Sequence, residues 1–162
     1  MQTIDNGRAR AVADLAAGQL LASVVIAASP ERVFRALTSS EITGWWVRPG
    51  VFDTREWSGD VRVGGRWRAS GVARGEPYTQ VGEFLEVDPP RKLTHTWDQA
   101  GKPGAPCTVT YHLDPVEGGT RLTLRQSGFA SAEMCSAFAI GWETSFERLA
   151  ESLASELAAS RT

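Results

Sequence analysis

The sequence predicts a single α+β domain in which a curved antiparallel sheet wraps a long C-terminal helix. Turn-forming residues recur at strand-length intervals between residues 52 and 127, which is typical of an antiparallel meander. Apolar and polar side chains alternate within these segments, so one face of the sheet needs a cover. After Gly128, apolar residues recur every three or four positions and predict the amphipathic helix that provides this cover. A length of 162 residues suits one such domain.

The first part of the chain predicts an arm, a strand and two short helices. Residues 1–17 are polar and alanine-rich without a strand period, so we expect a flexible or partly helical arm before a domain at residues 18–159. The β-branched run at residues 20–27 predicts the first strand. It stops at residues 29–31. There Ser29 suits the N-cap of a helix, Pro30 suits its first position, and Glu31 suits the positively charged end of its dipole. A second helical turn ends at Gly44.

The meander supplies most of a sheet for which we expect about six or seven strands. Its turn signals stand at residues 58–60, 75–77, 88–90, 101–106 and 117–119. From residue 61 we expect a strand in which Trp67 and Ala69 alternate with arginines, and in which Gly64 and Gly65 mark a bend. Similar alternation runs through three later strands, at residues 93–97, 109–113 and 122–126.

The final helix opens near Ser131 and Glu133. Its apolar positions form one stripe, made of Met134, Phe138, Trp142, Phe146, Leu149, Leu153 and Leu157. Gly141 lies within this helix, where glycine costs about 1 kcal/mol relative to alanine. Close approach to a strand backbone or to a ligand would justify that cost.

Composition narrows the class of protein. Hydrophobic residues make up 42% and charged residues 22% of the chain, as in ordinary globular domains. The net charge of -2 provides no general attraction to phosphate, so we expect no nucleic-acid partner.

Cys107 and Cys135 lack metal-ligand spacing, and no signal peptide or membrane span is evident. We therefore predict a cytoplasmic protein with reduced thiols, no metal and no cofactor. Its arginine and alanine usage suits a bacterial source.

Aromatic residues point to an internal pocket between the predicted sheet and the final helix. On the expected faces, several large rings converge there, and Trp45 and Trp46 lie where the short helices meet the sheet. The predicted ligand-binding residues are Trp46, Trp67, Glu83, His95, Trp97, Tyr111, Gln126, Phe138 and Trp142. The alternative is that these rings fill the interior completely, because aromatic side chains also dominate ordinary cores.

Acid–base chemistry in the same space is a further alternative. His95 lies on the predicted inner face between Leu93 and Trp97 and could act as a general base. Glu83, placed in phase with Val81 and Leu85, or Glu56 could join it. Equally, His95 could be a hydrogen-bonded core residue and the carboxylates could pair with arginines at the rim. We assign no catalytic residue. His112 is expected on the outer face.

Several ordered stretches resemble a known superfamily. They lie at residues 28–38, 46, 63–68, 82–93, 96–97, 119–124 and 127–129. Together they are similar to the START-related, or SRPBCC, superfamily with its helix-grip fold, over roughly residues 18–157. The closest resemblance is to bacterial homologues of the C-terminal domain of the heat-shock-protein ATPase activator. Members often carry histidine just before the final Ser-Gly, where this chain has Gln126, which cannot shuttle protons near neutral pH.

The resemblance implies three functions. Superfamily members bind lipids, sterols and other apolar molecules, some cyclise polyketides, and eukaryotic relatives stimulate a chaperone ATPase. We therefore expect first a binding module for a small hydrophobic or amphipathic molecule, acting as a monomer or homodimer. The alternatives are a co-chaperone-like protein in the stress response, with a chaperone or other protein as partner, and a cyclase or hydrolase. Fold alone does not select among them.

Overall fold

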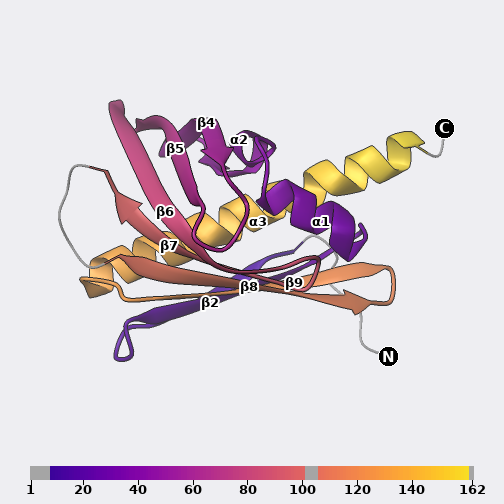
Figure 1. Cartoon of the computed structure of the whole chain (residues 1–162), viewed down its shortest axis with the longest axis horizontal. Helices are drawn as coiled ribbons and strands as arrows, with labels where there is room; N and C mark the ends of the chain where they lie inside the picture. The colour runs from indigo at the N-terminus through magenta and orange to yellow at the C-terminus, as the bar shows by residue number, and fades with distance from the viewer. Residues whose placement is uncertain (1–7, 101–105, 161–162) are drawn as a thin grey trace.

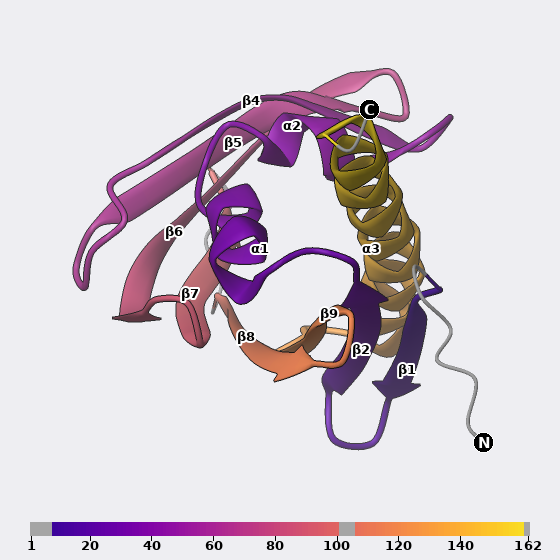
Figure 2. The same cartoon turned by 90° about the vertical axis from the view of Figure 1, so that its right-hand side faces the viewer.

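The computed structural model describes residues 8–100 and 106–160 and shows one curled antiparallel sheet with a long helix against it. The sheet has nine strands in the order β1-β2-β9-β8-β7-β6-β5-β4-β3. It curls into a half-barrel, and α3 lies across the open side (Figures 1 and 2). The predicted α+β helix-grip fold is therefore confirmed, with nine strands in place of six or seven.

The elements follow one another in an order close to that expected from the sequence. They are β1 (Arg10–Asp14), β2 (Gln19–Ile26), α1 (Pro30–Leu37), α2 (Ile42–Trp45), β3 (Val47–Arg48), β4 (Phe52–Gly59), β5 (Arg66–Ala73), β6 (Glu76–Asp88), β7 (Lys92–Gln99), β8 (Cys107–Val116), β9 (Gly119–Ser127) and α3 (Ala132–Ser160).

The two short helices form as their local signals predict. The Ser29 hydroxyl accepts a hydrogen bond from the backbone N–H of Arg32 at 3.2 Å, and Pro30 occupies the start of α1. The Trp45 indole N–H then donates to the carbonyl of Ala36 at 3.0 Å and holds α2 against α1. This attachment fixes the position of the next residue, Trp46, which is only 4% exposed.

The core lies between the concave face of the sheet and α3. The buried residues of α3 are Cys135, Ala139, Gly141, Trp142, Ser145, Phe146, Leu149, Ala150 and Leu153. The stripe predicted from the sequence is wrong at its ends, because Met134 is 38% and Leu157 37% exposed. The curled sheet covers only the middle of a 29-residue helix, so its last turns extend past the core (Figure 1).

Two strands were not expected from the sequence. Arg10–Asp14, part of the predicted arm, forms β1 and pairs with β2, and the backbone N–H of Ala11 donates to Glu143 of α3 at 3.1 Å. Its inward residues are alanines, whose small side chains and low strand propensity give little signal. The other addition is the two-residue β3. The expected behaviour of residues 1–7 lies outside the described residues.

The strand expected from residue 61 instead starts at Arg66. Residues 62–65 form a turn in which Gly64 has a φ of +85° and Val63 is 64% exposed. The turn is anchored to β6, because Gly64 N–H donates to the Phe84 carbonyl at 2.9 Å and Phe84 N–H donates to the Gly65 carbonyl at 2.8 Å. Alternation of valine with polar residues, which also occurs by chance in turns, caused the wrong assignment.

Among the described residues, no helix combines the length and the apolar character needed to cross a membrane. Cys107 and Cys135 are both free and buried, and the Cys135 thiol donates to the carbonyl of Gln19 at 3.4 Å.

Candidate functional site

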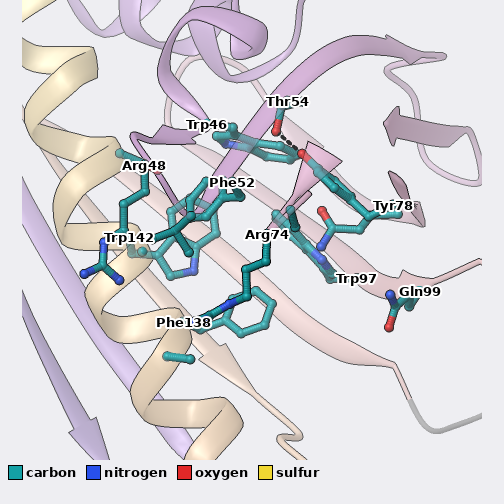
Figure 3. Close-up of a pocket in the computed structure, with 16 residues that line it drawn as sticks. Trp46, Arg48, Phe52, Thr54, Arg74, Tyr78, Trp97, Gln99, Phe138 and Trp142 are labelled. Carbon is teal, nitrogen blue, oxygen red and sulfur yellow. Dashed lines mark hydrogen bonds between the residues drawn. The ribbon is translucent and has the colours of Figure 1, made fainter. Parts of the chain in front are cut away.

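A pocket with a volume of about 300 Å³ lies between α3 and the half of the sheet that contains β3 to β7. It is partly open to solvent. Five aromatic side chains form its apolar floor and walls: Trp46, Phe52, Trp97, Phe138 and Trp142. Figure 3 shows these rings gathered beside α3, with polar side chains around them.

The rings of the floor support one another. The Trp46 and Trp97 ring centroids are 4.6 Å apart, and Trp97 meets Phe138 and Trp142 edge-on at 5.8 Å and 5.7 Å. The indole N–H groups of Trp46 and Trp97 are covered and have no hydrogen-bond partner within the described residues. Trp142 differs, because its N–H donates to the Gln126 side-chain carbonyl at 2.7 Å. The result is a rigid aromatic surface suited to a flat apolar group.

Small residues on α3 leave this space empty. Ala137, Gly141 and Ser145 line the pocket at four-residue intervals and therefore share one face of the helix. A Cβ added at Gly141 would be 3.4 Å from the nearest Phe52 ring carbon, which is ordinary contact. The pocket thus exists because α3 presents small side chains opposite large rings. Sequence reasoning followed the large residues of the helix and missed this second, small-residue stripe.

Polar groups stand around the aromatic floor. The hydroxyl groups of Thr54 and Tyr78 are hydrogen-bonded to each other (Figure 3). Burial raises the pKa of Tyr78, against the opposing effect of the bond to Thr54, so the phenol stays protonated at neutral pH. The side chains of Gln80 and Gln99 also line the pocket. These groups can donate to or accept from a polar part of a ligand.

Arg48 and Arg74 supply the charge of the pocket. No Asp or Glu is among its lining residues. Arg48 is half-buried and Arg74 is exposed, and neither has an ion-pair partner in the described parts of the chain. The pocket is therefore apolar at its floor and positively charged at its edge.

The other half of the interior is filled, and His95 lies at its centre. The His95 ring contacts Trp67, Phe84 and Tyr111 at centroid distances of 5.2, 6.0 and 5.8 Å. His95 Nδ1 is 2.9 Å from the Thr96 carbonyl oxygen, which also accepts a hydrogen bond from the Trp67 indole at 3.1 Å. Burial lowers the pKa of His95 to about 4, although the bond to Thr96 acts in the opposite direction. The ring is neutral near pH 7 and donates from Nδ1.

The predicted lining residues divide between these regions. Trp46, Trp97, Phe138 and Trp142 line the pocket, whereas Trp67, His95, Tyr111 and Gln126 lie buried behind it and do not. Gln126 nevertheless touches the pocket wall through its bond to Trp142. The pocket residues absent from the predicted set include Arg48, Phe52, Thr54, Arg74, Tyr78, Gln80, Gln99 and Gly141.

The expected inner position of Glu83 is wrong because β6 contains a bulge. Its pairing with β7 shifts between Phe84 and Glu86, so Phe84 and Val87 both pack against the core while Leu85 is exposed. Before the bulge the inner positions are Tyr78, Gln80, Gly82 and Phe84, and Glu83 lies on the outer face. A single unbroken alternation, taken from Leu85 and Val87, therefore placed this strand one residue out of phase.

The proposed acid–base partners of His95 lie elsewhere. Glu56 lines a separate polar hollow on the outer side of β4 and β5, together with Arg68 and Trp57. Within the described residues, no hydrogen bond joins His95 to Glu56 or Glu83. His112 is exposed, as expected. In the same parts of the chain, no group of three or more His, Cys, Asp or Glu side chains is arranged to hold a metal ion.

The solved structures that share this architecture include proteins from three bacteria. A protein from Chromobacterium violaceum is 28% identical, with a TM-score of 0.73, and the match covers 84% of this chain and 96% of that protein. A Rhodobacter sphaeroides protein is 27% identical, with a TM-score of 0.75 and coverage of 90% and 99%. The AHSA1 protein of Silicibacter pomeroyi is 26% identical, with a TM-score of 0.71 and coverage of 85% and 99%. Comparison with curated proteins gave no match.

The family comparison agrees with the fold. The family described as Activator of Hsp90 ATPase homolog 1-like protein matches residues 27–154, from the end of β2 to the last buried turn of α3. This span contains both the aromatic pocket and the filled half of the interior. The chain therefore belongs to the family of Activator of Hsp90 ATPase homolog 1-like proteins.

Proposed function

We propose that this protein binds a small amphipathic molecule in the pocket between the sheet and α3. The observation that carries the proposal is the open space of about 300 Å³ walled by five tryptophan and phenylalanine side chains. A ligand that buried roughly 200 Å² of apolar surface there would gain about 5 kcal/mol from the hydrophobic effect, before the cost of association. The surrounding hydroxyl, amide and guanidinium groups would fix its orientation.

Gly141 supports this proposal. Glycine inside a helix costs about 1 kcal/mol relative to alanine, and here no strand backbone requires it. An added Cβ would meet only the Phe52 ring, at 3.4 and 3.6 Å, and would take up pocket volume. A residue that weakens the helix but keeps the pocket open is expected where the pocket is used.

Native mass spectrometry of freshly purified protein tests the proposal. We expect a retained small molecule on the wild-type protein and its loss from Gly141→Leu, whose side chain would occupy the space. Ala154→Leu is the matched control, because it adds leucine at an exposed position of the same helix. A bound mass that Gly141→Leu retains as well as the control would place the ligand outside the pocket and contradict the proposal.

Stimulation of a heat-shock-protein ATPase is the alternative that the family description suggests. It would use an outer surface, so Gly141→Leu should leave any such stimulation unchanged. A cyclase or hydrolase built on His95 is disfavoured, because the ring is enclosed by aromatic side chains and its expected acidic partners lie on the outer side of the sheet.

A further inference from the structure

We infer that the molecule bound in this pocket carries an acidic group, a carboxylate or a similar anion, that is held at the pocket edge by Arg48 and Arg74. This inference rests on the proposed function, because it specifies the ligand of the same pocket. It predicts an apolar body against the indole rings and a negative charge at the opening.

The first observation is the charge of the residues that line the pocket. Its sixteen lining residues include two arginines and no carboxylate. The chain as a whole has 19 acidic and 17 basic residues, so unpaired arginines are not a result of a basic composition. Several arginines elsewhere in the chain form ion pairs: Arg32, for example, is bound by both Glu41 and Glu156. A pocket that concentrates positive charge in an acidic protein selects for a negative ligand.

The backbone holds the two arginines on one edge of the pocket. Arg48 ends β3, and the next turn returns the chain so that the N–H of Val51 donates to the Arg48 carbonyl at 2.9 Å. The N–H of Arg74 then donates to the carbonyl of Val51, also at 2.9 Å. The β3–β4 and β5–β6 turns are therefore joined, and Figure 3 shows the Arg48 side chain beside α3 and the Arg74 side chain close to Phe138.

The conformation of Arg74 is a second, independent observation. Its φ of +51° makes it the one non-glycine residue with positive φ in the described parts of the chain, and Gly75 follows with a φ of +82°. Two consecutive positive φ values define a hairpin turn that favours asparagine or glycine at its first position. Another residue there costs about 1 kcal/mol. Stability alone therefore does not explain an arginine at this turn, whereas a guanidinium needed at the pocket edge does.

The chemistry favours an acid over its neutral analogue. A hydrogen bond from a guanidinium to a carboxylate is about twice as strong as a bond between neutral groups, and arginine can form two such bonds to one carboxylate. Thr54, Tyr78 and Gln99 could complete the polar shell of the same group. A cationic ligand would meet two like charges and no carboxylate.

Matched acids and amides test this inference. Isothermal titration calorimetry at low salt would compare the affinity for 2-naphthoic acid with that for 2-naphthamide, and the affinity for decanoic acid with that for decanamide. We expect each acid to bind about tenfold more tightly than its amide, and the difference to shrink with added salt. In the double variant Arg48→Gln/Arg74→Asn this difference should disappear while amide binding persists. Arg125→Gln, on the outer face of β9, is the control and should keep it.

The outcomes separate this inference from the proposed function. Equal affinity for acid and amide, or a preference for acid that survives in the double variant, would overturn the inference and leave the pocket as a binding site. Failure of all four compounds to bind would overturn both. A thermal melt of the double variant checks its folding, which should match that of the wild-type protein because asparagine suits the turn.

Discussion

The interior of this protein has two halves that contain similar residues but differ in packing. Around His95, the side chains of Trp67, Phe84 and Tyr111 are buried and pack against its ring at centroid distances of 5.2, 6.0 and 5.8 Å. Around Trp97, equally large rings leave a pocket of about 300 Å³. The difference shows that aromatic content does not determine whether a cavity exists. What determines it is the size of the residues opposite the rings.

Two glycines, one in each half, show the same difference in packing. A Cβ at Gly82 would lie 2.0 Å from the Thr96 carbonyl oxygen and 2.1 Å from the Trp67 indole nitrogen, because Trp67 packs directly over this part of β6. A Cβ at Gly141 would have no neighbour closer than 3.4 Å. Gly82 is therefore required by close packing, whereas Gly141 leaves space that the fold does not need.

Gly82→Ala should have the largest effect on stability. The added methyl group must displace either β7 or the Trp67 ring, so we expect the free energy of unfolding to fall by about 3 kcal/mol or more. Denaturant titration would measure this loss. A decrease as small as that of a typical surface substitution would show that the filled half can adjust and would weaken the contrast with the pocket.

Protonation of His95 should have the next largest effect. Its pKa is about 4 in the folded protein and 6.5 ordinarily, so the neutral ring stabilises the fold. This contribution is complete above pH 6.5 and is lost as the pH falls toward 4, by about 3 kcal/mol in total. Unfolding titrations of wild-type and His95→Gln across this range should diverge accordingly. His112→Gln, at an exposed position, should behave like wild type.

Gly141→Ala should increase the stability of the fold, whereas Gly82→Ala should decrease it. Alanine favours the helix and its methyl group would contact Phe52, so we expect the free energy of unfolding to rise by up to about 1 kcal/mol. Binding of 2-naphthoate should weaken at the same time. Calorimetric melting and titration would measure the two effects, and a destabilised variant would show that this half is also tightly packed.

Arg74→Asn should have the smallest effect on stability and a clear effect on binding. Asparagine tolerates the positive φ of this turn, so the free energy of unfolding should stay constant or rise by a few tenths of a kcal/mol. The affinity for 2-naphthoate should fall severalfold while that for 2-naphthamide is unchanged. Unchanged affinity for the acid would show that Arg74 does not contribute to binding.

The elements that the sequence predicts well are those with strong local signals. Ser29 and Pro30 mark the start of α1, and the spacing of Trp142, Phe146 and Leu149 marks α3. The alanines of β1 and the bulge after Phe84 carry little local signal, because pairing with neighbouring strands decides both. For the same reason, four of the nine expected ligand-binding residues belong to the filled interior.

The edge of the pocket was the least predictable part. Arg48 and Arg74 are 26 positions apart and line the same pocket because two turns are hydrogen-bonded through Val51. The four-residue spacing of Ala137, Gly141 and Ser145 was visible in the sequence. That these small residues line a pocket depends on the aromatic rings opposite them, which only the folded sheet brings into place.

The most direct test of the pocket is the response of the tryptophan indole N–H signals in NMR spectra during titration with 2-naphthoate. Trp46, Trp97 and Trp142 report on the pocket, Trp67 on the filled half and Trp57 on the outer hollow. We predict the largest shifts at Trp46, Trp97 and Trp142 in the wild-type protein, and their loss in Gly141→Leu. Largest shifts at Trp67 or Trp57, or unchanged spectra throughout the titration, would contradict a binding site between the sheet and α3.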